Sequence, residues 1–333
     1  MVGVRLAAIA MLAALGLATA AARAAETVSV QLVKSIAQAP FYVAMGKGYF
    51  AQEGITVDAG EVRSALDTIA ALATGRLDAS IGAATAGFFN AAHREFDLRV
   101  VAAMGIQGPL MATQPLVRRA LWDDGTIRSA KDLRGRKVAT NAPGDITEYF
   151  LTLMLEKYGM SLKDVDVTPL AFGEQFVAFK NGAIDAGFLP EPLATTAQMA
   201  GSVALLKPEA DVGAGAITTF VFFGKRFIDE RRPVAVAFLR ALVRGARDTQ
   251  GAYNKTPEIA AMIARQTGLD PQAVERCTVF AIDPNLDIAK FEAGLRREEA
   301  VYRQNGRLTY DGPLAFDTVI DATLVHEAAA STR

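Results

Sequence analysis

Short apolar stretches alternate with helical patterns along most of the chain. Residues 28–33 alternate between apolar and polar side chains as a β-strand does, and a helix is predicted to begin at Pro40, a residue that suits the first helical turn. Gly54 then precedes a second predicted strand at residues 55–58. The order strand, helix, strand predicts an α/β fold.

One phrase of this pattern occurs twice. Residues 71–79 align with residues 178–186 at a constant offset. In each copy a helix is predicted to end at a glycine, where a left-handed residue is needed, and an apolar-Asp-Ala sequence leads into a short buried strand. Two similar α/β lobes that face one another would explain the repeat, and a chance match between two ordinary turns is the alternative. We expect Asp78 and Asp185 each to tie its own turn rather than to act as paired catalytic carboxylates.

Several predicted helices begin at a residue that can cap them. Ser64 is expected to cap a helix over residues 65–73, and Thr85 is expected to cap the following helix. In the second half of the chain, Asp145 and Glu148 form a D-x-x-E capping box for another helix. The helix starts are therefore placed by polar residues as well as by the apolar pattern.

Length and charge limit the classes of protein that fit this pattern. With 333 residues, of which 51% are hydrophobic and 21% charged, the chain is long enough to bury two cores. The 35 Lys and Arg residues balance 36 Asp and Glu residues, for a formal charge of -1. This balance gives no basic field that would favour binding to nucleic acid. The last apolar strand is predicted at residues 217–223, and the pattern after Lys225 is helical.

Residues 1–25 have the organisation of a secretory signal peptide. Arg5 gives a short basic start, residues 6–17 form an Ala- and Leu-rich apolar run, and Ala22-Arg23-Ala24 offers a small-x-small cleavage site. A retained membrane anchor is the alternative, although the run falls short of the roughly 20 strongly apolar residues that a span needs. No cysteine follows that could carry a lipid, so we expect an exported and soluble mature chain.

Residues that carry enzyme chemistry are scarce. Cys277 is the single cysteine and lies in an apolar stretch, so we expect a buried free thiol rather than a nucleophile. His93 and His326 have no evident partner at the spacing of a metal site or a catalytic triad. No nucleophile elbow, phosphate-binding loop or zinc-protease motif occurs. We therefore expect a binding protein without a cofactor or a metal, and not an enzyme.

Arg63 stands directly before a predicted helix start. A helix start offers free N–H groups and a partial positive charge, worth about 0.3–1 kcal/mol to a nearby anion. A guanidinium beside it would add a bidentate contact. These features favour an anionic ligand, and a solvated loop cation is the alternative for Arg63.

Several motifs follow one another along the chain: APFYVA at residues 39–44, GYF at 48–50, EGI at 53–55, the two Gly-x-x-Asp-Ala phrases, DLRG at 132–135, and Glu191-Pro192. In this order they resemble the substrate-binding proteins of ABC importers, in the nitrate, sulfonate and taurine group of the SsuA/THI5-like (NMT1) superfamily. The resemblance covers roughly residues 28–325 and does not specify the ligand.

The resemblance implies a periplasmic-binding-protein fold of type II, with two α/β lobes, a ligand cleft between them and a helical C-terminal segment packed on lobe one. Lobe one would comprise residues 27–112 and 219–333, and lobe two residues 113–218, with crossovers near residues 105–118 and 214–222. Ligand would favour the closed form because only there do both lobes contact it. The protein would work in the periplasm as a monomer and deliver its ligand to a permease in the inner membrane with its ATPase.

In this fold, ligands bind beyond the carboxyl ends of the strands, where helix N-termini converge. Applied to the predicted elements, this rule selects the candidate ligand-binding residues Ser35, Gln38, Arg63, Ser64, Ala84, Thr85, Gln107, Gly144, Asp145, Thr147 and Glu191. No catalytic residue and no metal ligand is expected among them.

The expected ligand is a small organic anion or zwitterion, such as an alkanesulfonate, a carboxylate or taurine. Arg63 favours an anion, whereas Asp145 and Glu191 would repel one or hydrogen-bond an amine. Nitrate is less favoured because its binders need further cationic groups that the sequence does not place. Two other classes stay open: a pyrimidine-precursor binder or THI5-like enzyme of thiamin biosynthesis, and an exported ligand sensor or adaptor.

Overall fold

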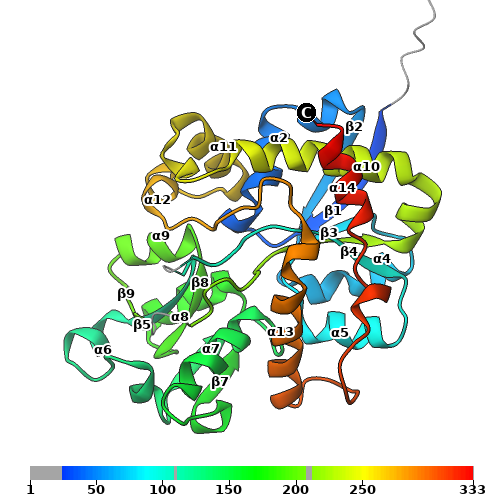
Figure 1. The fold of residues 1–333 in the computed structure, drawn as a ribbon. Coiled ribbons are helices and arrows are strands. Elements are labelled where there is room, and N and C mark those ends of the chain that lie inside the picture. The colour runs from blue at the N-terminus through cyan, green and yellow to red at the C-terminus, as the bar shows by residue number, and fades with distance from the viewer. Residues whose placement is uncertain (1–24, 109–110, 208–211, 333) are drawn as a thin grey trace, which may run out of the picture.

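Two α/β lobes make up the protein. The computed structural model describes residues 25–108, 111–207 and 212–332, and lobe two occupies the lower left of Figure 1. Each lobe is built on one five-stranded mixed sheet, so the predicted fold of two similar lobes is confirmed. The predicted signal peptide lies outside the described residues, except for its last residue.

The sheet of lobe one has the strand order β2-β1-β3-β10-β4. β1 pairs in parallel with β2 and β3, whereas β10 runs antiparallel to β3 and β4. The strands are β1 (Glu26–Leu32), β2 (Ile55–Glu61), β3 (Ala79–Gly82), β4 (Leu98–Ala103) and β10 (Phe220–Gly224). Because β10 follows every strand of the second sheet in the sequence, the chain crosses to lobe two after β4 and returns before β10.

The sheet of lobe two repeats this arrangement in the order β7-β6-β8-β5-β9. β6 pairs in parallel with β7 and β8, and β5 runs antiparallel to β8 and β9. The strands are β5 (Thr113–Arg118), β6 (Lys137–Thr140), β7 (Asp166–Pro169), β8 (Ala186–Pro190) and β9 (Val203–Leu205). The sequence pattern predicts neither β9 nor β5, which lies within the expected crossover at residues 105–118.

The repeated sequence phrase ends at equivalent places in the two sheets. β3 and β8 are the central strands and begin at Ala79 and Ala186, the last residues of the two copies. The glycines before them have φ values of 67° at Gly75 and 74° at Gly182, so both adopt the predicted left-handed conformation. The repeat is therefore a real correspondence between the lobes.

Asp78 and Asp185 do not tie their own turns, and that expectation is wrong. Asp78 Oδ2 accepts a hydrogen bond from the Ser29 N–H of β1 (2.9 Å), 49 residues away. Asp185 Oδ2 accepts one from the Lys137 N–H of β6 (3.2 Å), 48 residues away. An arginine from another element pairs with each carboxylate. In both lobes the aspartate joins the central strand to its neighbour, a long-range contact that a local pattern does not reveal.

Helices lie on both sides of each sheet. They are α2 (Ala39–Gly46), α3 (Tyr49–Gln52), α4 (Ile69–Ala73), α5 (Ala86–His93), α6 (Arg119–Asp123), α7 (Ile146–Glu156), α8 (Phe172–Asn181), α9 (Leu193–Met199), α10 (Lys225–Asp248), α11 (Pro257–Thr267), α12 (Pro271–Arg276), α13 (Glu292–Gln304) and α14 (Thr323–Ala330). The predicted helix over residues 65–73 is divided into a 3-10 helix, Ala65–Thr68, and α4.

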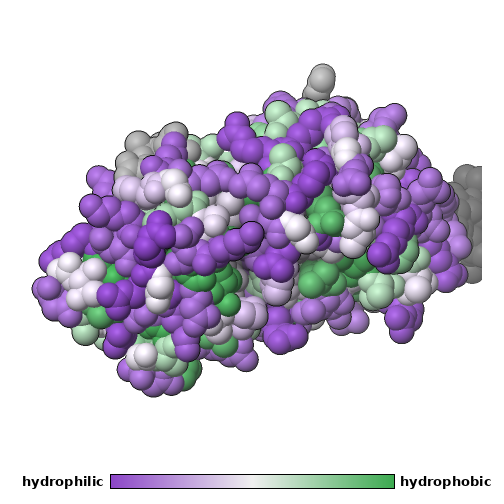
Figure 2. Space-filling model, turned by 90° about the horizontal axis from the view of Figure 1, so that it is seen from below, coloured by the Kyte–Doolittle hydropathy of each residue, from purple (hydrophilic) through white to green (hydrophobic). Residues whose placement is uncertain are grey.

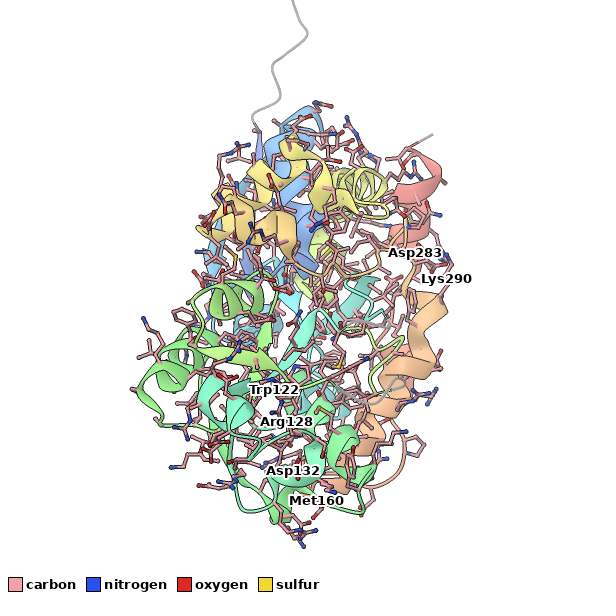
Figure 3. The ribbon with its side chains drawn as sticks, turned by 90° about the vertical axis from the view of Figure 1, so that its left-hand side faces the viewer. Trp122, Arg128, Asp132, Met160, Asp283 and Lys290 are labelled. Atoms are coloured by element: carbon pink, nitrogen blue, oxygen red, sulfur yellow. The ribbon has the colours of Figure 1, made fainter. Side chains whose placement is uncertain are left out.

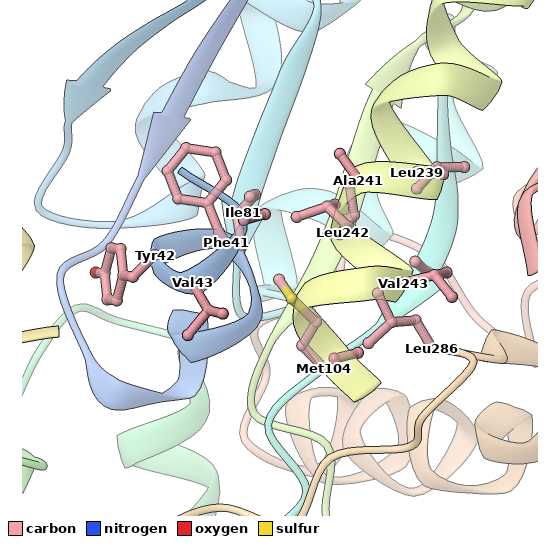
Figure 4. Close-up of a cluster of buried hydrophobic side chains, with 14 of the residues drawn as sticks. Phe41, Tyr42, Val43, Ile81, Met104, Leu239, Ala241, Leu242, Val243 and Leu286 are labelled. Atoms are coloured by element: carbon pink, nitrogen blue, oxygen red, sulfur yellow. The ribbon is translucent and has the colours of Figure 1, made fainter. Parts of the chain in front are cut away.

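The core of lobe one lies where α2 and α10 pack together. Figure 4 shows Phe41 of α2 and Leu242 of α10 within one cluster, and each is at most 2% exposed. Burying one such side chain contributes about 1.5–3 kcal/mol. The helices approach closely because Gly245 has no side chain: a Cβ there would lie 2.0 Å from the Pro40 carbonyl oxygen.

Most of the helical C-terminal segment packs on lobe one, as predicted. α14 contacts α10 and α11 contacts α2, while α13 runs between α7 of lobe two and α5 of lobe one (Figure 1). Asp283 binds Lys290 across 2.6 Å in the turn that leads into α13 (Figure 3). α13 therefore joins the two lobes at a place outside the crossovers.

The capping box predicted at the start of α7 is only half formed. Asp145 Oδ1 accepts from the Thr147 N–H (2.9 Å), but the Glu148 carboxylate does not return to the Asp145 backbone. Instead Glu148, which is fully buried, receives two hydrogen bonds from Arg307 beyond the end of α13 (2.9 and 2.8 Å). Tertiary pairing thus replaces the local pair.

Seen from below, the outer surface is largely hydrophilic, with hydrophobic residues in small patches (Figure 2). On lobe two, Arg128 lies 4.7 Å from the centre of the Trp122 ring and donates its backbone N–H to Asp132 (3.0 Å; Figure 3). Among the described residues, no helix is long and apolar enough to cross a bilayer.

Candidate functional site

A pocket with a cavity volume of about 40 Å³ lies between the two lobes, at the carboxyl ends of strands from both sheets. Val33 follows β1, Gly82 ends β3, Asn141 follows β6 and Pro190 ends β8. The full lining consists of Val33, Ser35, Ala37, Gln38, Ser64, Ala65, Gly82, Ala83, Thr85, Thr113, Asn141, Asp145, Ile146, Phe172, Pro190, Thr218, Thr219 and Phe280. The strand-end rule thus leads to a hollow that both lobes enclose.

Several helices or 3-10 helices begin at this pocket, and side chains cap four of them, whereas α8, which begins at Phe172, has no side-chain cap. The cap hydrogen bonds run from Ala37 N to Ser35 Oγ (3.1 Å), Leu66 N to Ser64 Oγ (3.2 Å), Phe88 N to Thr85 Oγ1 (3.2 Å) and Thr147 N to Asp145 Oδ1 (2.9 Å). The predicted caps at Ser64, Thr85 and Asp145 are confirmed. A cap that accepts an N–H removes it from the set that a ligand could use.

Asp145 is the one ionisable residue in the pocket lining. It is 3% exposed, and burial raises its pKa to about 6, although hydrogen bonds from Thr147 and Asn141 work in the opposite direction. The Thr147 hydroxyl donates to the same oxygen as the Thr147 N–H (2.6 Å). The pocket therefore contains one carboxyl group and no lysine or arginine.

Two amide side chains in the lining have a buried oxygen without a hydrogen-bond partner among the described residues: Gln38 Oε1 and Asn141 Oδ1. Asn141 Nδ2 donates to the Arg63 carbonyl oxygen (3.1 Å), which fixes the orientation of that amide and leaves its oxygen free. Gln38 belongs to lobe one and Asn141 to lobe two. No hydrogen bond from Gln38 Nε2 to the described part of the chain fixes the orientation of its amide, so Gln38 can present either its oxygen or its N–H group to the pocket.

Direct hydrogen bonds close the rim of the pocket. Across the lobes, the Ile36 N–H donates to the Glu191 carbonyl oxygen (2.8 Å), and the Ala86 N–H to the Gly144 carbonyl oxygen (2.7 Å). The buried Glu191 side chain also accepts from the Thr278 N–H of lobe one (3.3 Å). Burial raises the pKa of Glu191 to about 7, against hydrogen bonds from Thr195. The structure is therefore a closed arrangement of the two lobes.

Five of the predicted site residues line the pocket: Ser35, Gln38, Ser64, Thr85 and Asp145. The other six lie around it. Glu191 and Gly144 form the rim contacts, Thr147 supports Asp145, the Ala84 carbonyl accepts from the Tyr302 hydroxyl (3.2 Å), and Gln107 Oε1 accepts from the Ala112 N–H (2.8 Å). The Arg63 side chain is exposed and does not line the pocket. The role of all eleven in ligand binding stays a prediction.

Sequence reasoning misses several lining residues. Asn141 directly follows a predicted strand, so the strand-end rule could have selected it. Thr113 and Thr218 lie where the chain crosses between lobes, and Phe280 comes from the C-terminal segment. No sequence pattern places these last three at the strand ends, because only the tertiary fold brings them there.

The residues examined for enzyme chemistry lie elsewhere. Cys277 is 5% exposed and its Sγ donates to the Val274 carbonyl oxygen (3.1 Å), and burial raises the pKa of the thiol. His93 stacks on the Tyr310 ring at 4.2 Å, and His326 bonds to Asp287 at 2.8 Å. None of these three residues lines the pocket.

The sequence matches the model of the family described as NMT1/THI5 like over residues 35–279, well over half of the chain. The chain belongs to the NMT1/THI5-like family. Its resemblance to this superfamily, inferred above from the motifs, is thereby confirmed. The match begins at Ser35 and so includes every residue of the pocket lining except Val33 and Phe280.

Solved structures share the fold of this NMT1/THI5-like chain. The alkanesulfonate-binding protein SsuA from Xanthomonas axonopodis pv. citri, bound to MOPS, is 19% identical, with a TM-score of 0.72 over 89% of this chain and 98% of its own. The periplasmic aliphatic sulphonate-binding protein SsuA from Escherichia coli is 17% identical, with a TM-score of 0.70 over 89% of this chain and 92% of its own. The periplasmic nitrate-binding protein NrtA from Synechocystis is 16% identical, with a TM-score of 0.73 over 92% of this chain and 88% of its own.

These likenesses show the periplasmic-binding-protein fold and leave the ligand open, since the identities are low. The three named proteins are binding proteins, in agreement with the prediction of a binding protein rather than an enzyme.

Proposed function

We propose that this chain is the extracytoplasmic solute-binding receptor of an ABC importer. The observation that carries the proposal is the pocket between the lobes, which both sheets line at the carboxyl ends of their strands. Membership of the NMT1/THI5-like family and the likeness to named sulfonate- and nitrate-binding proteins support the same role.

The receptor works by closure of the two lobes over the solute. The chain crosses between lobes after β4 and before β10, and these crossovers allow one lobe to rotate against the other. A solute that contacts both lobes favours the closed form, in which the rim bonds at Glu191 and Gly144 also form. The closed receptor, a monomer in the periplasm, then delivers the solute to a membrane permease and its ATPase.

A thermal-shift screen tests the receptor function. The compounds are alkanesulfonates, nitrate, carboxylates, pyrimidines, amines and amides, each added to the mature chain. A true ligand at 100 times its dissociation constant stabilises the protein by about 2.7 kcal/mol and raises the unfolding midpoint. No stabilisation by any of these compounds would contradict the receptor function and favour a sensor or adaptor that binds another protein.

One candidate for the ligand is an organic anion or zwitterion such as an alkanesulfonate or taurine. The likeness to proteins named as alkanesulfonate-binding and sulphonate-binding favours it. In this case Arg63, which is exposed at the edge of the closed lobes, would have to turn toward the solute. Arg63→Ala then abolishes binding of the anion in calorimetric titration. An unchanged affinity for the anion rejects this role of Arg63, and no binding of the anion to the wild type rejects the candidate.

A further inference from the structure

The hydrogen-bond donors around the pocket are largely occupied. The hydroxyls of Ser35, Ser64 and Thr85 each accept an N–H of the helix that they cap. At the rim, the Ile36 and Ala86 N–H groups donate to carbonyl oxygens of the opposite lobe. An anion bound at helix starts needs several free N–H groups, and each of these contacts takes one from that set.

In contrast, buried hydrogen-bond acceptors of the pocket lining remain unpaired. Asn141 Oδ1 and Gln38 Oε1 have no partner among the described residues, although both atoms are buried. A buried polar atom without a partner costs roughly 1–3 kcal/mol, so a group that donates to it recovers that loss. An N–H group on a ligand is the natural partner for an amide oxygen.

The charge of the pocket also disfavours an anionic ligand. Asp145 is the one ionisable side chain in the lining, and it lies four residues after Asn141 in the same loop of lobe two. Its Oδ1 receives the bonds from Thr147, and a hydrogen bond from the Asn141 side chain also favours the charged form of this carboxyl group. A negative ligand beside this carboxylate would be repelled in a site without a compensating cation, whereas a positive one would be attracted.

We propose that the pocket selects a small ligand that presents N–H donors and carries no net negative charge: an amine, an amidine, an amide or an aminoheterocycle. This inference rests on the proposed receptor function and narrows its ligand. The N–H groups face Asn141 and Asp145 on lobe two and Gln38 on lobe one, so the ligand joins the lobes through its donors. The hydroxyls of the caps keep their own protons and can donate to an acceptor elsewhere on the ligand.

The body of the ligand packs against apolar residues. Ile146 and Phe172 of lobe two and Phe280 of the C-terminal segment complete the lining beside the polar loop. Phe280 is 1% exposed and Ile146 is 5% exposed, so these walls are fixed by the surrounding core. A flat or short hydrocarbon frame with one nitrogen-bearing end fits both halves of the pocket.

Matched compounds of one shape test the proposal by calorimetric titration. Benzamidine, benzamide, benzoate and benzenesulfonate share a ring and differ in charge and donors, and propylamine, propanamide, propanoate and propanesulfonate repeat the series on a smaller frame. We expect the tightest binder of each bound series to be the cation or the neutral amide. Asp145→Asn keeps a residue that caps helices well but removes the charge, so it weakens the cation by on the order of tenfold.

Two comparisons make the Asp145→Asn result specific. The same variant weakens binding of the neutral amide by at most about threefold, because the amide loses only the charge assistance of a hydrogen bond, whereas the cation also loses an opposite charge. Asp132→Asn is the control, since Asp132 is another capping carboxylate of lobe two that does not line the pocket. It leaves the affinities of both compounds unchanged.

The outcomes separate the ligand class from the receptor function. If only anions bind, the receptor function stands and the donor-selective pocket is overturned. If cations and amides bind but Asp145→Asn weakens both equally or neither, the assignment to Asp145 is overturned. If no compound of any charge in these series or in the thermal-shift screen binds, both the receptor function and the donor-selective pocket fail.

Discussion

Asp145 occupies a position where folding and binding make opposite demands. Its carboxylate caps α7 through the Thr147 N–H, and a charged cap is favourable at a helix N-terminus. The same group is buried at the pocket, and burial disfavours the charge, so that its pKa rises to about 6. The burial of this carboxylate therefore lowers the stability of the protein, and a ligand that donates a hydrogen bond to it would relieve that cost.

The stability of the ligand-free protein should therefore depend on pH through Asp145. Between the ordinary pKa of 3.8 and the raised value of about 6, the folded state binds more protons than the unfolded chain, so stability falls as the pH rises. Relative to Asp145→Asn, the wild type should lose up to about 3 kcal/mol of unfolding free energy between pH 4 and pH 7. Urea denaturation at a series of pH values measures this difference.

Asp132 is a matched control, for which the expected change of stability with pH has the opposite sign. Hydrogen bonds from Arg128 and Ser129 outweigh the effect of burial and lower the pKa of Asp132, so Asp132 contributes stability above its unfolded pKa. The wild type should gain stability relative to Asp132→Asn as the pH rises from acid toward neutral. A difference between wild type and Asp145→Asn that does not change with pH would contradict the account of Asp145.

For single residues, the sequence predicts the helix caps well and the directions of long side chains poorly. Ser64, Thr85 and Asp145 are identified because a cap and a helix start are neighbours in the chain. Arg63 is different: its carbonyl oxygen, not its guanidinium, meets Asn141 of the other lobe. The direction of a loop arginine depends on tertiary contacts that no local pattern contains.

Among the elements, α13 has the most consequence for how the lobes move. It contacts α7 of lobe two and α5 of lobe one, and Tyr302 on it donates to the Ala84 carbonyl oxygen (3.2 Å). Beyond its end, Arg307 pairs with Glu148, which is fully buried. The helix therefore fastens lobe two to the C-terminal segment, and rotation about the crossovers must carry α13 with one lobe or break these contacts.

Arg307→Ala should destabilise the protein by about 3 kcal/mol, because it leaves the Glu148 carboxylate buried without its partner. Arg119→Ala is the control: Arg119 and Asp123 form an ion pair whose side chains are 54% and 53% exposed, and its loss should change the stability little because solvent screens such a pair. Chemical denaturation measures both. A cost for Arg307→Ala as small as that of the control would show that this contact does not fasten the lobes.

The sequence predicts most helices and parallel strands but not the tertiary contacts that join them. The apolar pattern locates β3 and β8, whereas β5 lies within the stretch assigned to a crossover and β9 has only three residues. Gly245 gives no signal in a helical pattern, since the reason for a glycine there is the Pro40 carbonyl of another helix. Likewise, the pairing of Glu148 with Arg307 could not be found from the local spacing that favoured a capping box.

For the whole molecule, the internal repeat is the most informative feature of the sequence. The two sheets have the same strand arrangement, and the repeated phrase marks the central strand of each. Because the carboxyl ends of these strands face one another across the lobes, the pocket follows from the fold. The chemistry of the pocket does not follow from the repeat, since Gln38, Asn141 and Phe280 lie outside it.

The central claim is that one small solute is held between the lobes, and Ala83→Phe tests it most directly. Ala83 follows β3 and lines the pocket, so a phenyl ring there occupies the space of the solute. Ala70→Phe is the control, at an exposed position of α4 outside the lining. The titrant is the compound that stabilises the wild type most in the thermal-shift screen.

Calorimetric titration of the three proteins gives the answer. We predict one site in the wild type, an affinity in Ala70→Phe equal to that of the wild type, and a loss on the order of 100-fold or more in Ala83→Phe, because a close-packed site leaves no room for both rings and ligand. Binding by a folded Ala83→Phe with wild-type affinity would place the solute elsewhere and contradict the account.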